Sequence, residues 1–122
     1  MISYATIGTN DVARAEAFYG PLLATQGVTK LFDHPNGGVV FGKDGRLVLG
    51  ALTPFDRNKA TVGNGTMIAL DMPDRAAVDA FHAKALELGG SCEGPPGERG
   101  PGFYMAYFRD PEGNKFCACK LG

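Results

Sequence analysis

Apolar and polar positions along the chain follow two kinds of spacing, which occur in the same order twice. Residues 2–8 alternate and predict a strand. Residues 12–23 carry apolar side chains at helical spacing, and the side-chain oxygens of Thr9-Asn10-Asp11 just before them can cap a helix. Short apolar runs then predict three further strands, at 28–32, 39–41 and 47–52.

The second half of the chain repeats this order. A strand is expected at 66–70, and Pro73-Asp74 begins a second helix that ends at Gly89-Gly90. The inward face of this helix is expected to carry Val78, Phe81, Ala85 and Leu88. The segment 94–102, GPPGERGPG, is expected to be a loop, and strands are expected at 103–108 and 115–121.

Two local signals refine the first half. Gly20-Pro21 falls within the first helical pattern, so a kink or a restart is expected there. Asp44-Gly45 tolerates the positive φ angles of a two-residue hairpin and predicts a tight turn.

A shift of 63 positions superposes the two halves. It places Asp11 on Asp74 and Phe18 on Phe81, among six identities in seventeen positions. We therefore expect one α+β domain, 1–122, built from two βαβββ modules at approximately 1–53 and 65–122. Each helix would cover the outer face of its strands, and pairing would give a curved eight-stranded mixed sheet with a concave trough.

Composition excludes several partners. The net charge is −1 without a basic block, so neither nucleic acid nor an anionic membrane is expected to bind. The chain has no run of 18 apolar residues, and its first residues lack a targeting pattern, so no membrane partner is expected. Three cysteines without disulfide-framework spacing predict reduced thiols and a cytoplasmic protein.

Three stretches carry a resemblance to a known family: TIGTNDVARAEAFY, AAVDAFHAKALELGG and YFRDPEGNKF. Together they resemble the vicinal oxygen chelate superfamily, which includes glyoxalase I, fosfomycin-resistance enzymes, extradiol dioxygenases and bleomycin-resistance proteins. The resemblance covers the whole chain and implies paired βαβββ modules, assembled as a homodimer.

The resemblance also locates the family's metal ligands. Its metal-dependent members use His on the first and fifth strands and Glu on the last, and these positions fall on Tyr4, Met67 and Cys117. Some members add a Glu on the fourth strand, and aligning the turns Asp44-Gly45 and Glu112-Gly113 places Leu49 at that position. Since none of these side chains suits a hard cation, neither a metal nor another cofactor is expected.

The same resemblance directs Tyr107 into the cavity, ten residues before the last-strand position. Alternation would then place Met105 and Phe103 beside it, although core packing is an alternative for Phe103. Cys119 shares the face of Cys117 for the same reason. The expected ligand-binding cavity therefore contains Tyr4, Leu49, Met67, Phe103, Met105, Tyr107, Cys117 and Cys119.

Other chemical readings of these residues stay open. Cys117 and Cys119 could bind a soft metal or act as reactive thiols, but buried cysteines also serve as small hydrophobic residues. His34 in a turn and His82 on a helix surface are expected to lie outside the cavity. Arg99 and Arg46 could meet an anionic ligand at its rim, or be solvated.

Two functions follow from these residues. The first is binding of a small, partly apolar molecule in the sheet cavity without the family metal. The second is catalysis, by a glyoxalase-like lyase or isomerase with unusual ligands, or by an enzyme that uses Tyr4 or Cys117 as an acid–base group.

Overall fold

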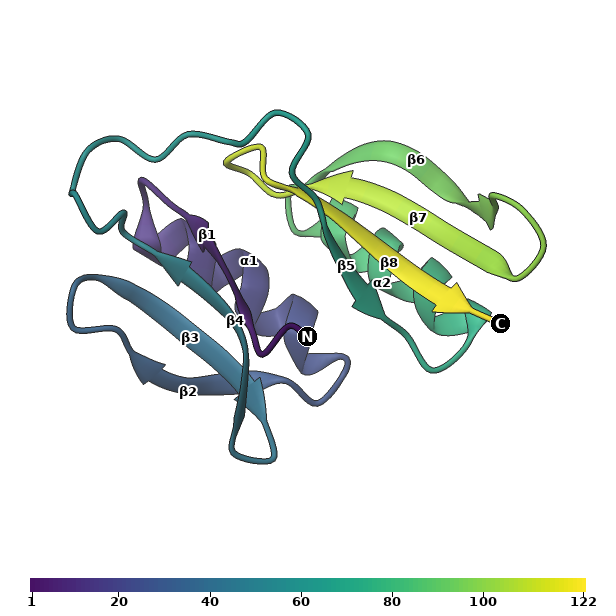
Figure 1. Ribbon diagram of the computed structural model, residues 1–122, viewed down its shortest axis with the longest axis horizontal. Helices are drawn as coiled ribbons and strands as arrows, with labels where there is room; N and C mark the ends of the chain where they lie inside the picture. The colour runs from purple at the N-terminus through teal and green to yellow at the C-terminus, as the bar shows by residue number, and fades with distance from the viewer. The chain divides into compact units, whose positions relative to one another are not determined.

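The computed structural model describes residues 1–122, and the chain divides into two compact units, 1–63 and 64–122. Both units have the element order β-α-β-β-β (Figure 1). The first contains β1 (Ala5–Gly8), α1 (Val12–Ala24), β2 (Thr29–Asp33), β3 (Gly38–Lys43) and β4 (Arg46–Leu52). The second contains β5 (Ile68–Asp71), α2 (Arg75–Glu87), β6 (Ser91–Glu98), β7 (Phe103–Arg109) and β8 (Lys115–Leu121). The α+β class and the repeated module are confirmed.

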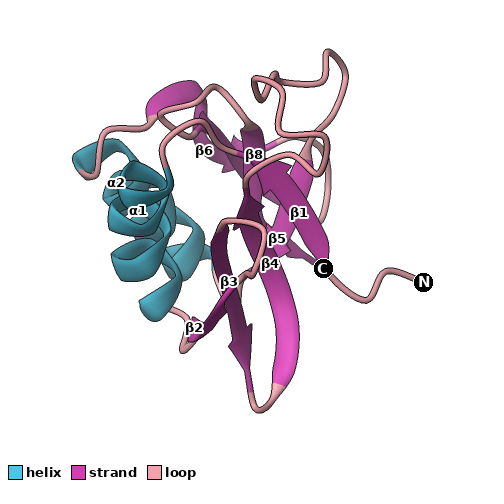
Figure 2. Cartoon of the chain, turned by 90° about the vertical axis from the view of Figure 1, so that its left-hand side faces the viewer, coloured by secondary structure: helices cyan, strands magenta, loops and turns pink.

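Each unit forms its own four-stranded mixed sheet. The strand orders are β1-β4-β3-β2 and β5-β8-β7-β6, so the eight strands hydrogen-bond as two sheets of four. In each sheet the first strand runs parallel to the last, and the other pairs are antiparallel. Within each unit the helix covers one face of the sheet (Figure 2). The other face is called the helix-free face below.

Equivalent aspartates begin the two helices. Asp11 accepts a hydrogen bond from the backbone N–H of Arg14 at 3.0 Å, and Asp74 accepts one from Ala77 at 2.8 Å. Both use an otherwise unpaired N–H of the first helical turn, as a capping side chain does. Because these aspartates are 63 positions apart, they confirm the repeat at the level of hydrogen bonding.

Helix α1 continues through Pro21 without a restart. Proline removes one backbone donor, but Phe18 and Leu22 on either side of it are each only 1% exposed. Burial of this apolar face against the sheet compensates for the missing hydrogen bond. Neither helix is long and apolar enough to cross a membrane.

Aromatic side chains fill the space between each helix and its sheet. In the first unit, the Tyr19 ring on α1 lies 6.4 Å from that of Phe41 on β3. In the second, Phe81 on α2 lies 6.0 Å from Phe108, which stacks on Phe116 at 5.6 Å. The predicted inward residues Val78, Phe81 and Ala85 are fully buried, while Leu88 at the helix end is half-buried.

The predicted loop at 94–102 is wrong in its first half, because Gly94–Glu98 belongs to β6. Pro95 and Pro96 have no N–H to donate, but β6 is an edge strand and needs only one hydrogen-bonded neighbour. Its pairing with β7 shifts register on both sides of Gly94. The glycine and proline content therefore marks an irregular edge strand rather than a loop.

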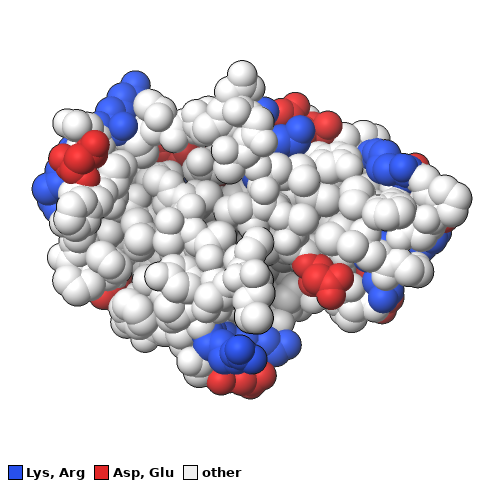
Figure 3. All heavy atoms as spheres, viewed as in Figure 1, with Lys and Arg blue, Asp and Glu red and all other residues white.

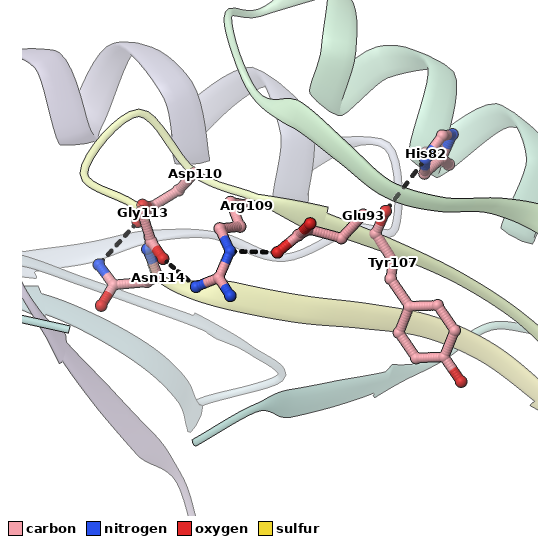
Figure 4. Close-up of polar contacts among 7 residues, drawn as sticks. All are labelled: His82, Glu93, Tyr107, Arg109, Asp110, Gly113 and Asn114. Atoms are coloured by element: carbon pink, nitrogen blue, oxygen red, sulfur yellow. Dashed lines mark hydrogen bonds and ion pairs between the residues drawn. The ribbon is translucent and has the colours of Figure 1, made fainter. Parts of the chain in front are cut away.

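Two turns connect the strands β3 with β4 and β7 with β8. Asp44 and Gly45 have φ angles of 52° and 76°, which confirms the predicted tight hairpin between β3 and β4. Between β7 and β8, the Asp110 carboxylate accepts hydrogen bonds from Glu112 N, Asn114 N and Asn114 Nδ2 at 2.8–2.9 Å. Figure 4 shows part of this brace, in which Arg109 also donates to the Gly113 carbonyl.

Removal of the Asp110 carboxylate should destabilise the protein. Asp110 is 4% exposed, so Asp110→Ala leaves the partly buried N–H donors of Glu112 and Asn114 without their acceptor. We expect the free energy of unfolding to fall by about 2–4 kcal/mol in urea denaturation. The matched control is Asp56→Ala, because Asp56 accepts from Asn58 N in an exposed turn. Equal stability losses in the two variants would contradict a special role for the β7–β8 turn.

Candidate functional site

The pairing of β7 with β8 decides which side chains reach the helix-free face of the second unit. Phe108 and Phe116 are register partners, and both pack beneath Phe81 on α2. Tyr107 and Cys117, also register partners, therefore point the opposite way. Figure 4 shows the Tyr107 ring directed away from α2, whereas its carbonyl accepts a 3.2 Å hydrogen bond from His82 on that helix.

Six of the predicted cavity residues lie on this one face. Alternation along β7 from Tyr107 adds Met105 and Phe103, and alternation along β8 from Cys117 adds Cys119. Ala69 pairs with Cys117 and therefore faces the same way, and continuing the alternation from Ala69 to the residue just before β5 adds Met67. Phe103 and Met67 are 49% and 42% exposed, whereas both cysteines are buried. The face thus combines accessible apolar side chains with buried thiols. Binding of a ligand by these residues stays a prediction.

The two remaining cavity residues belong to the first unit. Alternation from Ala5, which pairs with Leu49, directs Tyr4 to the helix-free face, where it is half exposed. The structure corrects the predicted position of Leu49, which does not face the cavity. Leu49 pairs with Phe41, whose ring lies next to Tyr19 on α1, so Leu49 is buried beneath the helix.

A β-bulge explains the misplacement of Leu49. The β3–β4 register shifts between Phe41 and Gly42, which leaves Val48 as the extra residue and reverses which side chains face the helix. Thr6 pairs with Gly50, and Ala69, 63 positions after Thr6, pairs with Cys117. Gly50 is therefore the first-unit counterpart of Cys117, one position away from the residue that aligning the turns selects.

Two cations lie close to the Tyr107 ring. The Arg99 guanidinium carbon and the Lys115 ammonium nitrogen are each 5.5 Å from its centroid. The hydroxyl donates to Met105 Sδ at 3.1 Å. In the view of Figures 1 and 3 this sheet lies in front of α2, and most of the visible surface is uncharged. A positive cluster around an aromatic ring is therefore a local feature of a mainly neutral face.

Both thiols of β8 are held in the protonated form. Burial, and then the neighbouring Cys119, raises the pKa of the Cys117 thiol to about 11. Burial, and then the Asp71 carboxylate, raises the pKa of Cys119 as well. Their sulfur atoms lie 3.5 and 3.6 Å from the carbonyl oxygens of Ala118 and Leu70. These are the properties of packed thiols, since a reactive cysteine needs a lowered pKa.

The two histidines have structural partners. His82 is buried rather than on the helix surface, and because a carbonyl can only accept, its Nε2 donates to Tyr107. His34 is half-buried, and its Nδ1 accepts a hydrogen bond from Asn36 N at 3.1 Å. The shared hydrogen bond of His82 ties α2 to the strand that carries Tyr107.

Sequence reasoning missed a cavity in the first unit. It has a volume of about 360 Å³ and lies where β1, the His34–Asn36 turn and the segment after β4 meet. Arg57 donates to both the carbonyl and the side-chain oxygen of Asn36, which ties the segment after β4 to that turn. No sequence motif marks this cavity, because it is enclosed by turns that are distant in the chain.

The residues at the family's metal positions do not suit a hard cation. Once Gly50 replaces Leu49, these positions are Tyr4 with a phenol, Gly50 with no side chain, Met67 with a thioether and Cys117 with a thiol. None is an imidazole or a carboxylate, the side chains that the family resemblance implies at a metal site. Nor do three His, Cys, Asp or Glu side chains gather in an arrangement that could hold a metal ion.

Comparison with known proteins supports the family assignment. A model of the glyoxalase-like domain matches residues 4–119. A glyoxalase/bleomycin resistance protein from Albidiferax ferrireducens T118 is 36% identical, with a TM-score of 0.88 over 98% of this chain and 97% of that one. No match was found among curated proteins.

Two more distant structures share the fold. TnmS3, an antibiotic binding protein from Streptomyces sp. CB03234, is 24% identical, with a TM-score of 0.69 over 100% of this chain and 96% of that one. Lactoylglutathione lyase from Agrobacterium tumefaciens is 23% identical, with a TM-score of 0.67 over 98% of this chain and 92% of that one. The same architecture thus occurs in a binding protein and in an enzyme.

The three thiols should differ in reactivity. At pH 8, Ellman's reagent should modify the exposed Cys92 rapidly and the buried Cys117 and Cys119 slowly, and all three after unfolding. Cys92→Ser should remove the rapid phase. Rapid modification of Cys117 in the folded protein at pH 8 would overturn the assignment of a packed thiol.

The same raised pKa makes stability depend on alkaline pH. Because Cys117 binds its proton more tightly when folded, its contribution is complete below pH 9 and is lost as the pH rises from 9 to about 11. Cys117→Ala should therefore show a shallower decline in melting temperature over this range than the unmodified protein.

Proposed function

Because the chain belongs to the family of glyoxalase-like domains within the vicinal oxygen chelate superfamily, we propose that it binds a small, partly apolar organic molecule without a metal ion. The binding surface is the helix-free face of residues 64–122. The observation that carries this proposal is the convergence of Met105, Tyr107 and Cys117 on that face, with Met67 alongside.

The chemistry of these side chains supports binding of an apolar or aromatic group. Met67 and Phe103 expose apolar surface, and exposed apolar side chains grouped on one face commonly mark interaction sites. Methionine adapts to ligands of different shape, and the thioether of Met105 lies beside the phenol of Tyr107. Tyr107 adds a ring and one hydrogen-bonding group, which is the usual composition of a small-molecule site.

The same residues do not favour the catalytic alternative. A cysteine acts as a nucleophile or base through its thiolate, and the pKa of Cys117 near 11 keeps it a thiol at neutral pH. The metal positions supply no carboxylate base either, since the position of the family Glu is Cys117. A binding role of the kind named for TnmS3 therefore fits these residues better than lyase chemistry.

We further propose that the protein works as a homodimer in the cytoplasm. Ile2 and Phe55 in the first unit are 90% and 95% exposed, which is apolar surface that a second copy can cover. Three free cysteines suit a reducing compartment.

Binding can be tested by thermal shift with a panel of aromatic and apolar antibiotics that includes bleomycin. At least one compound should raise the melting temperature, and Met67→Asp should abolish that shift by placing a charge on the apolar surface. Leu86→Asp is the matched control, because Leu86 is a partly exposed apolar residue of α2.

Metal dependence is tested by measuring ligand binding and metal content on the same samples. Dialysis against a chelator should leave ligand binding intact, and purified protein should contain far less than one metal ion per chain and turn over no methylglyoxal–glutathione adduct. Stoichiometric metal whose removal abolishes binding or activity would refute the metal-free proposal. A panel without a single stabilising compound would count against the binding role.

Assembly can be tested by light scattering. At micromolar concentration the protein should have the mass of a dimer, whose interface should exceed about 1,000 Å². Phe55→Asp should shift the mass toward the monomer if the exposed apolar surface of the first unit forms the interface. A monomer over the whole concentration range would contradict the proposal.

A further inference from the structure

Two cations on the helix-free face of the second unit have no carboxylate partner. Three of the six Lys and Arg residues of this unit are paired: Arg75 with Glu98, Lys84 with Glu87, and Arg109 with Glu93. Arg99 and Lys115 instead direct their charges at the ring of Tyr107, each at 5.5 Å from its centroid. Their charges are thus available to a ligand on the surface that we propose binds small molecules.

The position of Arg99 is fixed by the backbone around it. Its Nη2 donates to the Pro95 carbonyl at 2.6 Å, and the guanidinium lies over the Tyr107 ring. A guanidinium held in this way keeps other N–H donors for an oxyanion, which it can bind through two hydrogen bonds. Arg99 is therefore oriented before a ligand arrives, so less side-chain entropy is lost on binding.

Glycines of β6 make room for this arrangement. A Cβ at Gly94 would lie 2.9 Å from Cδ2 of Tyr107, and a Cβ at Gly97 would lie 2.9 Å from Nη1 of Arg99. Real Cβ atoms do not approach that closely, so a side chain at either position would displace the ring or the guanidinium. Gly94 and Gly97 thus have a specific steric role in placing Arg99 beside Tyr107.

The charges nearby leave the cluster positive. Arg109 and Asp71 also lie on this face by their register with Lys115 and Cys119. The Glu93 carboxylate is bound by Arg109, and Asp71 acts on Cys119, whose pKa it raises. Cys117, directly opposite Tyr107, is a neutral thiol at physiological pH. Asp71 adds one negative charge to this face, but neither Arg99 nor Lys115 forms an ion pair with a carboxylate.

Repulsion between the charges of Arg99 and Lys115 favours binding of an anion near both. Since both charges lie 5.5 Å from one centroid, they are at most 11 Å apart, close to the Debye length of about 8–10 Å at physiological salt. Their repulsion is then only partly screened, and a negative group between them gains from both. We propose that the ligand of this face is an organic oxyanion, a carboxylate or phosphonate attached to an apolar or aromatic group.

In this complex the oxyanion contacts Arg99 and Lys115, and the apolar part lies along Met105 and Phe103 on the same strand face. The inference rests on the proposed small-molecule function and adds the charge of the ligand. The inference also predicts that cationic compounds bind more weakly than anionic ones, because Arg99 and Lys115 would repel them.

Three small probes separate charge from shape in isothermal titration calorimetry: benzoate, phenylphosphonate and benzamide. At 20 mM NaCl at least one anion should bind at least about tenfold more tightly than neutral benzamide, which corresponds to about 1.4 kcal/mol. This advantage should shrink at 500 mM NaCl, because salt screens exposed charges. The benzoate–phenylphosphonate pair identifies which oxyanion is preferred.

Variants then locate the effect. Arg99→Gln and Lys115→Gln should each weaken binding of the preferred anion by about tenfold or more, in the range of a lost charge-assisted hydrogen bond, while leaving benzamide unchanged. Lys120→Gln is the matched control, because Lys120 is on the same strand but pairs with Tyr104, which faces α2. Arg99→Lys should retain part of the affinity. Circular dichroism and melting temperature verify folding of each variant.

The outcomes separate the inference from the proposed function. Equal affinity for benzoate and benzamide, failure of both anions to bind, or an equal loss in Lys120→Gln would overturn the anion site. If the antibiotic panel yields neutral or cationic ligands that depend on Met67, the binding function stands and only the anion inference fails. If neither panel nor probes bind, both fail.

Discussion

The register of β7 against β8 is the constraint on which the second unit depends. The stacked rings of Phe108 and Phe116, with Phe81 above them, fix one face of this strand pair beneath α2. Because side chains alternate, the same contact directs Tyr107 and Cys117 outward. A slip of one residue would bury the phenol and the thiol under the helix and expose the phenylalanines. The core therefore specifies the site, although it shares no side chain with it.

Local chemistry made much of the fold predictable. The helix starts near Asp11 and Asp74 and the Asp44-Gly45 turn are decided within a few residues, and they appear in the structure as expected. The segment GPPGERGPG was misread because proline and glycine oppose regular strands. An edge strand with interrupted register tolerates them, and edge position is a property of the sheet rather than of the segment.

The misassignment of Leu49 has a similar origin. Two hairpins can share a turn signal and still differ by one residue in register, and the bulge at Val48 has no clear mark in the sequence. The orientation of Tyr107 could not be read from strand parity, because residues 103–108 are apolar on both faces, and it was predicted from the family resemblance instead. The positions of Arg99 and Lys115 around Tyr107 could not follow from the sequence, because they depend on space left by glycines on a neighbouring strand.

The two prolines of β6 also bear on how this sheet can grow. An edge strand ordinarily presents a row of free amide donors to which another chain can add a strand. Pro95 and Pro96 interrupt that row on the outer side of the second unit, beyond β7. Regular β-sheet extension across this edge is thereby hindered. The strand that precedes Arg99 is therefore kept from pairing regularly with a strand of another chain.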